Sequence, residues 1–411
     1  MKIQPIRGTH DLFGDEISKY RKLEKEVNNL ATINDFNEII TPIFESTYLF
    51  SKPLGEQSDV VLKEMYTFED KNGDSLTLRP EHTTPMLRAA ISNNFLEKIP
   101  SKLFGVGPVF RRERPQKGRY RQFNQINFEI LGTNDILADV ELIILANSLI
   151  KNLMPNKKII LEINSLGDKN ALNKFKSDLS IYFDKFKNTF SKDIQDKINS
   201  NPIRILDSKE LYKNEIIYNS PKISDYYSKE ANIIFENIKK LLSDLNIDFL
   251  VNQNLVRGLD YYCHTVFEFK SNDLGAQDTL IGGGRYDGLI KLLGGPDLPG
   301  VGWAGGVERI LMLMDNANKY TKSSYLIIMD EEFKNYGLRI ASELRKNSIK
   351  VHFDYKYNLK KSLSNASQIK SEYALIIGEN EVNNNVCTIK NLKKNTQETT
   401  TIDKIISELI K

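Results

Sequence analysis

The sequence contains few of the side chains that build disulfides and metal sites. Its 411 residues include two cysteines and four histidines. Cys263 and Cys387 are too far apart for a CxxC pair or a disulfide framework, which is typical of a chain in a reducing cytosol. The histidines do not fall at ligand spacings either. We therefore expect a cytoplasmic protein that has no tightly bound metal.

Long apolar runs, nucleotide-binding glycine motifs and a strong net charge are also missing. No apolar run approaches the ~20 residues that span a bilayer, and the start, MKIQPIRGTHDLFGDE, has no signal-peptide core. The absence of G-x-G-x-x-G and G-x-x-x-x-G-K-S/T disfavours Rossmann and P-loop sites. At a net charge of +3, a nucleic-acid partner must be bound by local basic patches. We expect no membrane contact.

The length and the hydrophobic content of 40% predict two or three globular domains. From residue 323 to 411, strand and helix patterns alternate, which predicts a separate, mostly parallel α/β domain. Residues 168–229 are rich in Lys, Asp and Asn with helical apolar spacing, which predicts a small helical insertion. The main domain would then comprise residues 1–167 and 230–318.

Arginine is scarce in the chain but concentrated in one window. Lysines outnumber the 15 arginines by almost three to one, yet five arginines lie between Arg111 and Arg121. Arginine is favoured over lysine where a planar fork must bind phosphate or carboxylate through two bonds. The window follows a strand-like run, SKLFGVGPVF, and precedes the alternating apolar positions of QFNQINFEIL. This pattern predicts an antiparallel hairpin with an anion-binding loop at its tip.

Upstream of the window, the pattern predicts a helix over residues 16–31 and a strand over FNEIITPIFE. Pro42 within that strand favours an edge or a subunit interface, because proline donates no ladder hydrogen bond. A hairpin is predicted for MYTFED and LTLRPEHTTP, which flank an Asn-Gly turn. Thr84 followed by Pro85 predicts the start of a helix. Just before it, Glu81 and Thr83 offer acceptors for an ammonium group.

Three glycine-containing blocks lie further along the chain, and each carries one arginine. They are LVRGLDYY with Arg257, GGGRYDGL with Arg285 and GWAGGVERI with Arg309. Glycine in such positions indicates a bulge or a close approach to the backbone. In an arginine-poor chain this recurrence favours a functional site.

These blocks, with TLRPEHT and FRRERPQKGRYRQFNQINFEILG, resemble the signature blocks of the histidyl-tRNA synthetases, a class II aminoacyl-tRNA synthetase family. The resemblance covers nearly the whole chain. It implies an α+β fold: an antiparallel class II catalytic sheet flanked by helices, with a small helical insertion and a C-terminal α/β anticodon-binding domain. IITPIFE resembles the motif that builds the family's dimer interface, so a homodimer is expected.

The resemblance also implies a histidine site. Glu81, Thr83 and Gln125 would accept hydrogen bonds from the substrate α-amino group. His82 belongs to this block, although many members carry glycine there. We expect the His82 backbone to line the site and its ring to point away.

The imidazole of the substrate would lie between Glu129 and Tyr262, one group on each ring nitrogen. That arrangement distinguishes histidine from an isostere. Tyr261 and Tyr286 would complete the wall of the pocket.

For ATP, the family roles transfer to the arginines. Arg111 would bridge the histidine carboxylate and the α-phosphate, and Arg119 and Arg309 would bind the outer phosphates, with Glu113 beside them. Arg257 would contact both the histidine and the α-phosphate opposite Arg111. In this family an arginine acts there in place of a metal ion, so Arg257 and Arg111 are the expected catalytic residues. Magnesium would accompany ATP as part of the substrate complex.

At the loop tip, Arg114 and Gln116 would contact the acceptor end of tRNA, whereas Arg112 and Arg121 stay unassigned. The implied reaction is ligation of L-histidine to tRNA(His) through a histidyl-adenylate, which needs no protein nucleophile. Two alternatives lack this activity: the synthetase-like regulatory subunit of ATP phosphoribosyltransferase and a synthetase-like RNA sensor. The presence of Arg257, Tyr262 and the C-terminal domain argues against the first, and the intact motif arginines argue against the second.

Overall fold

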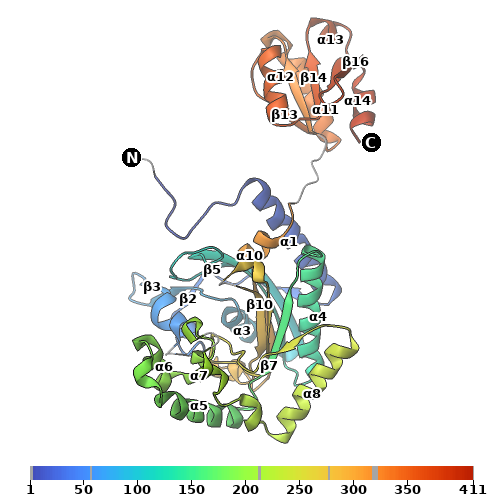
Figure 1. The fold of residues 1–411 in the computed structure, drawn as a ribbon. Coiled ribbons are helices and arrows are strands. Elements are labelled where there is room, and N and C mark those ends of the chain that lie inside the picture. Colours follow the sequence, from blue (N-terminus) through green and yellow to red (C-terminus); the bar gives the residue numbers. More distant parts are fainter. Residues whose placement is uncertain (1–2, 56–57, 212–213, 276–277, 317–322, 411) are drawn as a thin grey trace. The chain divides into compact units, whose positions relative to one another are not determined.

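The computed structural model describes residues 3–55, 58–211, 214–275, 278–316 and 323–410. The chain divides into two compact units, Met1–Ala317 and Asn318–Lys411 (Figure 1). Within the described residues, no helix combines the length and the apolar character that a membrane crossing requires.

The larger unit is built on an eight-stranded sheet in the order β1-β5-β6-β11-β10-β9-β7-β8. Its six central strands are all paired antiparallel, and only the short edge strands β1 (Asn37–Glu38) and β8 (Leu250–Val251) are parallel to their neighbours. The α+β class with an antiparallel catalytic sheet is therefore confirmed.

The predicted hairpin lies toward one side of this sheet, next to the edge strand β1. β5 (Ser101–Phe110) pairs with β6 (Gln122–Leu131) over its whole length. Side chains alternate between the two faces of a strand. Ile126, Phe128 and Ile130 of β6 therefore enter the main apolar core, while the intervening polar residues face the opposite side.

The helices α1 (Gly14–Ile33), α4 (Ile136–Leu153) and α8 (Lys229–Asp244) pack on this face and contribute to the same core, together with the other strands of the sheet. The first of them confirms the helix predicted over residues 16–31. Phe128 contacts the ring of Trp303 on β11 (Gly300–Gly306) at a centroid distance of 4.9 Å. One face of the sheet is therefore closed by helices and aromatic packing, and the other is left for the functional site.

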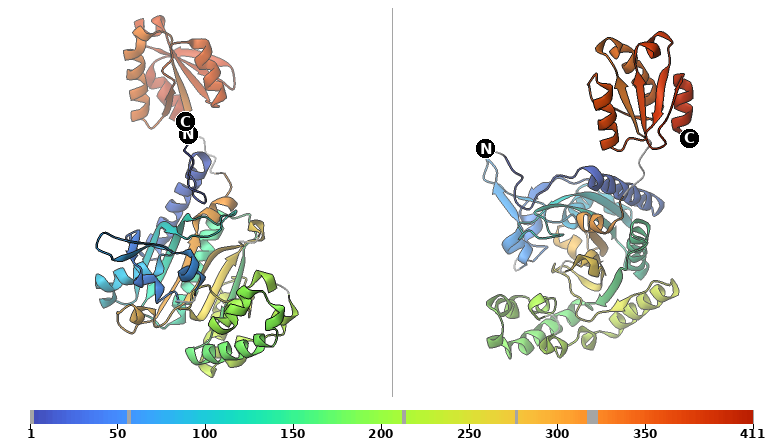
Figure 2. Two further views of the ribbon diagram at one scale, coloured as in Figure 1. Left: turned by 90° about the vertical axis from the view of Figure 1, so that its left-hand side faces the viewer. Right: turned by 45° about the horizontal axis from the view of Figure 1, so that its top comes forward.

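The opposite face packs on α3 (Thr83–Ser92) and on a helical segment that contains α5 (Lys169–Asp184), α6 (Lys192–Ser200) and α7 (Glu215–Tyr218) (Figures 1 and 2). The segment predicted to be helical is thus helical. It shares a second apolar core with β9 (Cys263–Lys270), which contributes Val266, and with α3, which contributes Met86 and Leu87.

Two local predictions were wrong. FNEIITPIFE does not form one strand: β1 ends at Glu38, and β2 (Phe44–Ser46) belongs to a separate sheet with β4 (Ser75–Leu78) and β3 (Tyr66–Glu69). Pro42 lies between them, where it can join no ladder. The start of α3 also differs, because the helix begins at Thr83 and the Glu81 carboxylate, not Thr84, accepts its first N–H groups.

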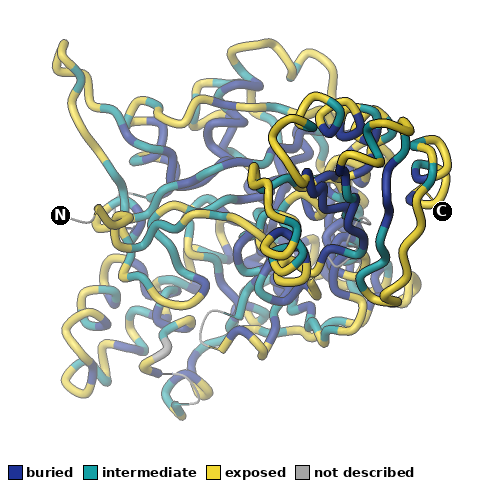
Figure 3. The backbone as a smooth tube through the Cα atoms, turned by 90° about the horizontal axis from the view of Figure 1, so that it is seen from above, coloured by how far each residue is buried: buried dark blue, intermediate teal, exposed yellow. Residues whose placement is uncertain are grey.

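The C-terminal unit has a five-stranded sheet in the order β13-β12-β14-β15-β16. Its strands are β12 (Ser323–Ile328), β13 (Lys350–Phe353), β14 (Tyr373–Ile377), β15 (Cys387–Asn391) and β16 (Thr396–Thr400). The first three are parallel, as predicted, but β15 and the unpredicted β16 are antiparallel. With α11 (Lys334–Lys346), α12 (Leu359–Gln368) and α14 (Ile402–Ile410) the sheet encloses its own apolar cores (Figure 3).

Candidate functional site

A cleft of about 850 Å³, including the part open to solvent, lies on the face of the large sheet that the core helices leave free. Its lining comes from the hairpin β5–β6, the start of α3, the loop before β9, and the strands β10 (Thr279–Arg285) and β11 with the following α10 (Val307–Leu313). Elements far apart in the sequence thus meet at one concavity.

One part of the cleft is strongly cationic, since Arg111, Arg119 and Arg309 all line it. Arg309 donates from Nε to the Gly118 carbonyl (2.9 Å) in the hairpin turn. Burial and the charges of Arg111 and Arg119 lower the pKa of Arg309 to about 10. Three guanidinium groups held this close favour a polyanionic ligand that relieves their repulsion.

The Arg119 side chain is held in place by two carboxylates. It forms ion pairs with Glu113 and with Glu64, the latter at 3.4 Å. Gly118, with a φ of 74°, makes the tight turn before it. Arg111 donates from Nε to the Pro80 carbonyl (2.9 Å) and lies over the Phe123 ring. The cationic groups are therefore positioned before any ligand binds.

A hydrogen-bonded chain joins Arg257 to this cationic part. Arg257 forms a close ion pair with Glu268 of β9. Glu268 accepts from the Thr279 hydroxyl (3.0 Å), and the Thr279 carbonyl accepts from Arg309 (2.8 Å). The guanidinium of Arg257 packs on Gly282, where any Cβ would overlap it. Its Nε is buried and has no hydrogen-bond partner among the described residues, so it retains a free donor.

A second part of the cleft offers acceptors. Glu81 accepts the backbone N–H groups of Thr83 and Thr84, both at 2.8 Å, and the Thr84 hydroxyl, which leaves part of its capacity unused. The Oε1 of Gln125 is buried and has no hydrogen-bond partner among the described residues. Thr83 and Gln125 both line the cleft. An ammonium group is the complement to this set.

Glu129 lies behind this lining rather than in it. Its carboxylate is fully buried and accepts from the Thr83 hydroxyl (2.7 Å) and the Tyr286 hydroxyl (2.5 Å). Small residues on the neighbouring strand make the room, because a Cβ at Gly302 would overlap the Glu129 carboxylate. A Cβ at Gly300 would likewise overlap the Tyr286 ring. The glycine-rich blocks are therefore positions where strands accommodate site side chains.

Glu129 should make folding depend on pH. Burial raises the pKa of Glu129 to about 8, against the hydrogen bonds from Tyr286 and Thr83. A folded-state pKa above the unfolded value of ~4.3 stabilises the fold below pH 4.3. That contribution is lost as the pH rises toward 8, at up to about 1.4 kcal/mol per pH unit.

The Glu129→Gln variant should therefore lose less stability than the original chain between pH 5 and 8. Urea unfolding monitored through Trp303, the single tryptophan and a buried residue of the larger unit, provides the measurement. Equal pH slopes for the two proteins would contradict the assigned pKa.

The remaining predicted residues fall into two groups. Tyr261 and Tyr262 line the cleft, with ring centroids 4.6 Å apart, but Tyr286 lies behind them. The His82 ring points away from the cleft toward the Gly107 carbonyl (3.1 Å) on β5. Burial and the nearby Arg79 lower the pKa of His82 to about 3, so the ring is neutral.

At the tip of the hairpin, Arg112, Arg114 and Gln116 are exposed. Arg121 donates to the Glu113 carbonyl at 3.3 Å, which gives it a structural role in the loop. Arg285 does not reach the cleft. It forms a buried ion pair with Asp139 of α4 and donates to the Thr133 carbonyl (3.0 Å), so it links the sheet to the core helix.

Several lining residues were missed by the sequence analysis. Phe123, Tyr120 and Glu308 line the cleft, and Glu268 holds Arg257 from behind. Phe123 lies two residues before Gln125 on β6, so the alternation of side chains along a strand already predicts that it faces the site. Glu308 and Glu268 gave no signal, because their partners come from other strands: Glu308 accepts from the Asn124 N–H at 2.9 Å.

The helical segment contacts the loop that carries Arg257 and the tyrosines. Arg204 donates to the Gly258 carbonyl (2.7 Å) and the Asp260 carboxylate (3.1 Å). Asn201 donates to the same carboxylate oxygen at 2.7 Å. The loop is therefore held from outside the sheet by hydrogen bonds to charged groups.

Comparisons with known proteins agree with this geometry. The family model described as Histidyl-tRNA synthetase matches residues 8–310, and the model described as Anticodon binding domain matches residues 323–411. A histidine--tRNA ligase of Wolbachia pipientis subsp. Culex pipiens (strain wPip) is 45% identical over 409 residues, which cover 100% of both chains. That of Wolbachia pipientis wMel is 46% identical over 95% of this chain and 96% of its own.

Among solved structures, the apo histidyl-tRNA synthetase of S. aureus superimposes with a TM-score of 0.81 at 31% identity, and the match covers 100% of both chains. The family model covers far more than half of the chain, and the curated relatives match it end to end. The chain therefore belongs to the histidyl-tRNA synthetase family.

Proposed function

We propose that the protein ligates L-histidine to tRNA(His) in two steps, through a histidyl-adenylate formed from ATP. One observation supports this most strongly: a single cleft joins a triple-arginine part to a part rich in acceptors and tyrosines. Catalysis then needs positioning and electrostatic stabilisation of the phosphoryl centre, and no nucleophilic side chain.

For the amino acid, we assign the α-amino group to Glu81, Thr83 and Gln125, which present the free acceptors. The imidazole would contact Tyr262, with Tyr261 as the wall. Glu129 and Tyr286 lie behind this lining. Glu129 would act on the imidazole through the Thr83 and Tyr286 hydroxyl groups, which donate hydrogen bonds to its carboxylate. It would act directly if a hydrogen bond to the ligand replaced one of these two. The His82 backbone completes this part of the site.

For ATP, we assign the phosphates to Arg111, Arg119 and Arg309, and Phe123 supplies an aromatic surface for the base. ATP enters as its Mg²⁺ complex. Glu113 and Glu308 are carboxylates of the lining that can supply the oxygen ligands which Mg²⁺ prefers. The histidine carboxylate attacks the α-phosphorus and pyrophosphate leaves. Arg111 and Arg257 would stabilise the charge at that phosphorus.

For tRNA, we assign the acceptor end to the exposed loop tip with Arg114 and Gln116, and a second contact to the C-terminal unit. There, Tyr355 is 78% exposed next to Lys356 and close in sequence to Lys360 and Lys361. Exposed aromatic rings among cationic side chains suit single-stranded bases and phosphates. Since tRNA and ATP are the substrates, we place the reaction in the cytoplasm.

We also propose a homodimer through the segment around Pro42. Ile40 is 81% exposed, Phe44 54% and Tyr48 65% in the single chain. Such a group of large exposed apolar side chains, with Phe44 on the edge strand β2, is typical of an interface. Sedimentation of the purified protein as a monomer at micromolar concentration would rule this out.

The central test of the function is histidine-dependent ATP–pyrophosphate exchange with pure protein, followed by charging of tRNA(His) transcript. Exchange with histidine and its absence with the other amino acids is the expected result. No exchange at saturating histidine would favour the inactive regulatory subunit or the RNA sensor. Neither the regulatory subunit nor the RNA sensor requires three guanidinium groups that converge on one cleft.

The contact between the helical segment and the Arg257 loop yields a further prediction. Arg204→Ala should lower kcat/KM for histidine by about tenfold, because it removes two hydrogen bonds from a charged donor. Lys197→Ala is the matched control. Lys197 lies on α6 and forms exposed ion pairs with Asp193 and Asp59, which contribute little. If both variants show the same exchange kinetics, the contact does not position the loop.

A further inference from the structure

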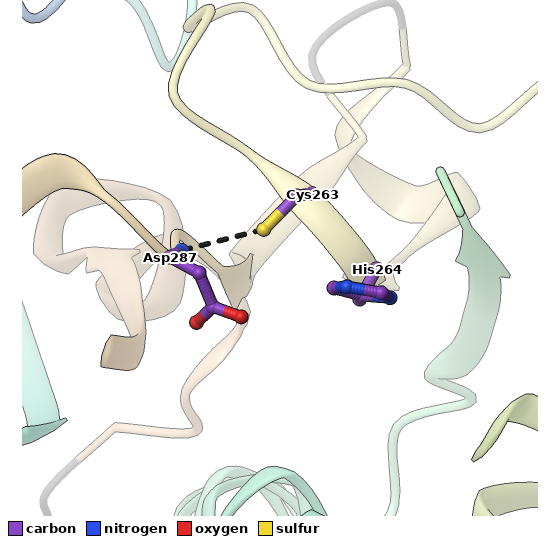
Figure 4. Close-up of side chains that lie close together, drawn as sticks. All are labelled: Cys263, His264 and Asp287. Carbon is purple, nitrogen blue, oxygen red and sulfur yellow. Dashed lines mark hydrogen bonds between the residues drawn. The ribbon is translucent and has the colours of Figure 1, made fainter. Parts of the chain in front are cut away.

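Three side chains outside the cleft lining lie together where β9 begins and just after β10 ends. Cys263, His264 and Asp287 each offer one donor atom, and these atoms all lie within 4.8 Å of one another. Figure 4 shows the Cys263 sulfur directed toward Asp287, with the His264 ring beside them. No local sequence motif indicates this group, because Asp287 is more than twenty residues from the other two members.

The backbone brings the first two together by breaking the strand pattern. Successive residues of a strand normally point to opposite faces. His264, however, has a φ of 47°, and the pairing with β10 shifts between Gly284 and Arg285 at this point. Such a bulge redirects a side chain. Asp287 follows two residues after the end of β10.

The donor set fits a cation of intermediate softness. A thiolate, an imidazole and a carboxylate are all ligands that Zn²⁺ accepts, and three protein ligands leave one position open. The Nδ1 of His264 is buried and has no hydrogen-bond partner among the described residues. The Asp287 N–H donates to the Cys263 sulfur at 3.3 Å. Burial and the Asp287 carboxylate raise the pKa of the Cys263 thiol to about 12, so the cation would bind with release of the thiol proton.

The charges also match. Arg285 is the nearby cation, 3.6 Å from the Asp287 carboxylate, but its own ion pair with Asp139 already neutralises it. One thiolate and one carboxylate would therefore balance one divalent cation. Ligand atoms of a tetrahedral zinc site are roughly 3.3–3.8 Å apart, given the usual bond lengths. Side-chain movements of about 1 Å would bring the three donor atoms from their present separations, all within 4.8 Å, to these distances.

We propose that Cys263, His264 and Asp287 form a binding site for one divalent cation of the Zn²⁺ class. The cation would connect β9 to the turn after β10. Tyr262 and Tyr286, the immediate neighbours of two ligands, would be fixed by the same connection. Its role is structural and takes no part in adenylate formation.

The test uses full-length protein freed of metal with a chelator and titrated with Co²⁺. A near-ultraviolet charge-transfer band from cobalt–thiolate coordination should saturate at one equivalent and disappear when Zn²⁺ is added. The band should be lost in Cys263→Ser. In His264→Ala the affinity for Co²⁺ should be at least tenfold weaker. It should persist in Cys387→Ser, the matched control, since these are the only two cysteines of the chain.

A second readout guards against a variant that misfolds. Zn²⁺ should raise the urea midpoint monitored through Trp303 in the original chain and in Cys387→Ser, but not in Cys263→Ser. A missing band in the original chain, or a band that depends on Cys387, would overturn the proposal.

Discussion

Replacing Arg257 with alanine is expected to lower the rate of histidine-dependent ATP–pyrophosphate exchange by about 10²–10³, with a smaller change in the KM for histidine. The reason lies in how Arg257 is held. Its guanidinium is paired with Glu268, packs on Gly282 and keeps a free donor at Nε. A preorganised charge of this kind acts mainly on the transition state, where charge develops at the phosphorus.

The controls separate the role of Arg257 from that of its partner. Arg257→Lys keeps the charge but loses the planar fork, so an intermediate rate is expected. Glu268→Gln should reduce the rate about tenfold by loosening Arg257, and it should have no further effect when Arg257 is already alanine. Unchanged exchange in Arg257→Ala would remove Arg257 from the mechanism. Additive losses in the double variant would show that Glu268 acts independently.

The sequence predicted the hairpin β5–β6 well because three local signals agree there. Apolar alternation defines both strands, glycine marks the turn at Gly118, and arginine is concentrated between them. The same alternation separates Ile126 and Phe128, which enter the core, from Gln125 and Glu129 on the site face. Where local pattern and tertiary packing coincide, a single sequence is sufficient.

Prediction failed where the deciding partner is distant. The start of α3 depends on Glu81, which turns back to accept its first N–H groups. Nothing local decides that Arg285 pairs with Asp139 of α4, whereas Arg309 reaches Gly118 in the hairpin. β16, with the burial pattern of an exposed edge strand, has no apolar alternation to reveal it. Cross-strand contacts and edge strands therefore need the fold itself.

Removal of residues 323–411 is expected to lower kcat/KM for charging of full-length tRNA(His) by at least about 10², and to change ATP–pyrophosphate exchange by less than about threefold. The lining residues of the cleft lie between Glu81 and Arg309, all within the larger unit. The C-terminal unit has its own apolar core, so its loss leaves the core of the larger unit complete. The binding energy lost is that of tRNA phosphates and bases.

A short RNA helix that carries only the acceptor end of tRNA(His) makes this prediction specific. It lacks the rest of the tRNA, which is the part that we assign to the C-terminal unit, so the full-length and truncated proteins should charge it equally. Tyr355→Ala in the full chain should lower kcat/KM for charging of whole tRNA, because a base stacked on the ring contributes about 1–3 kcal/mol of binding free energy. Charging of the short helix should not change. Equal losses of exchange and charging after truncation would instead mean that the C-terminal unit is needed to fold the larger one. In that case the tRNA contact would have to be sought at the hairpin tip, where Arg114 and Gln116 are exposed.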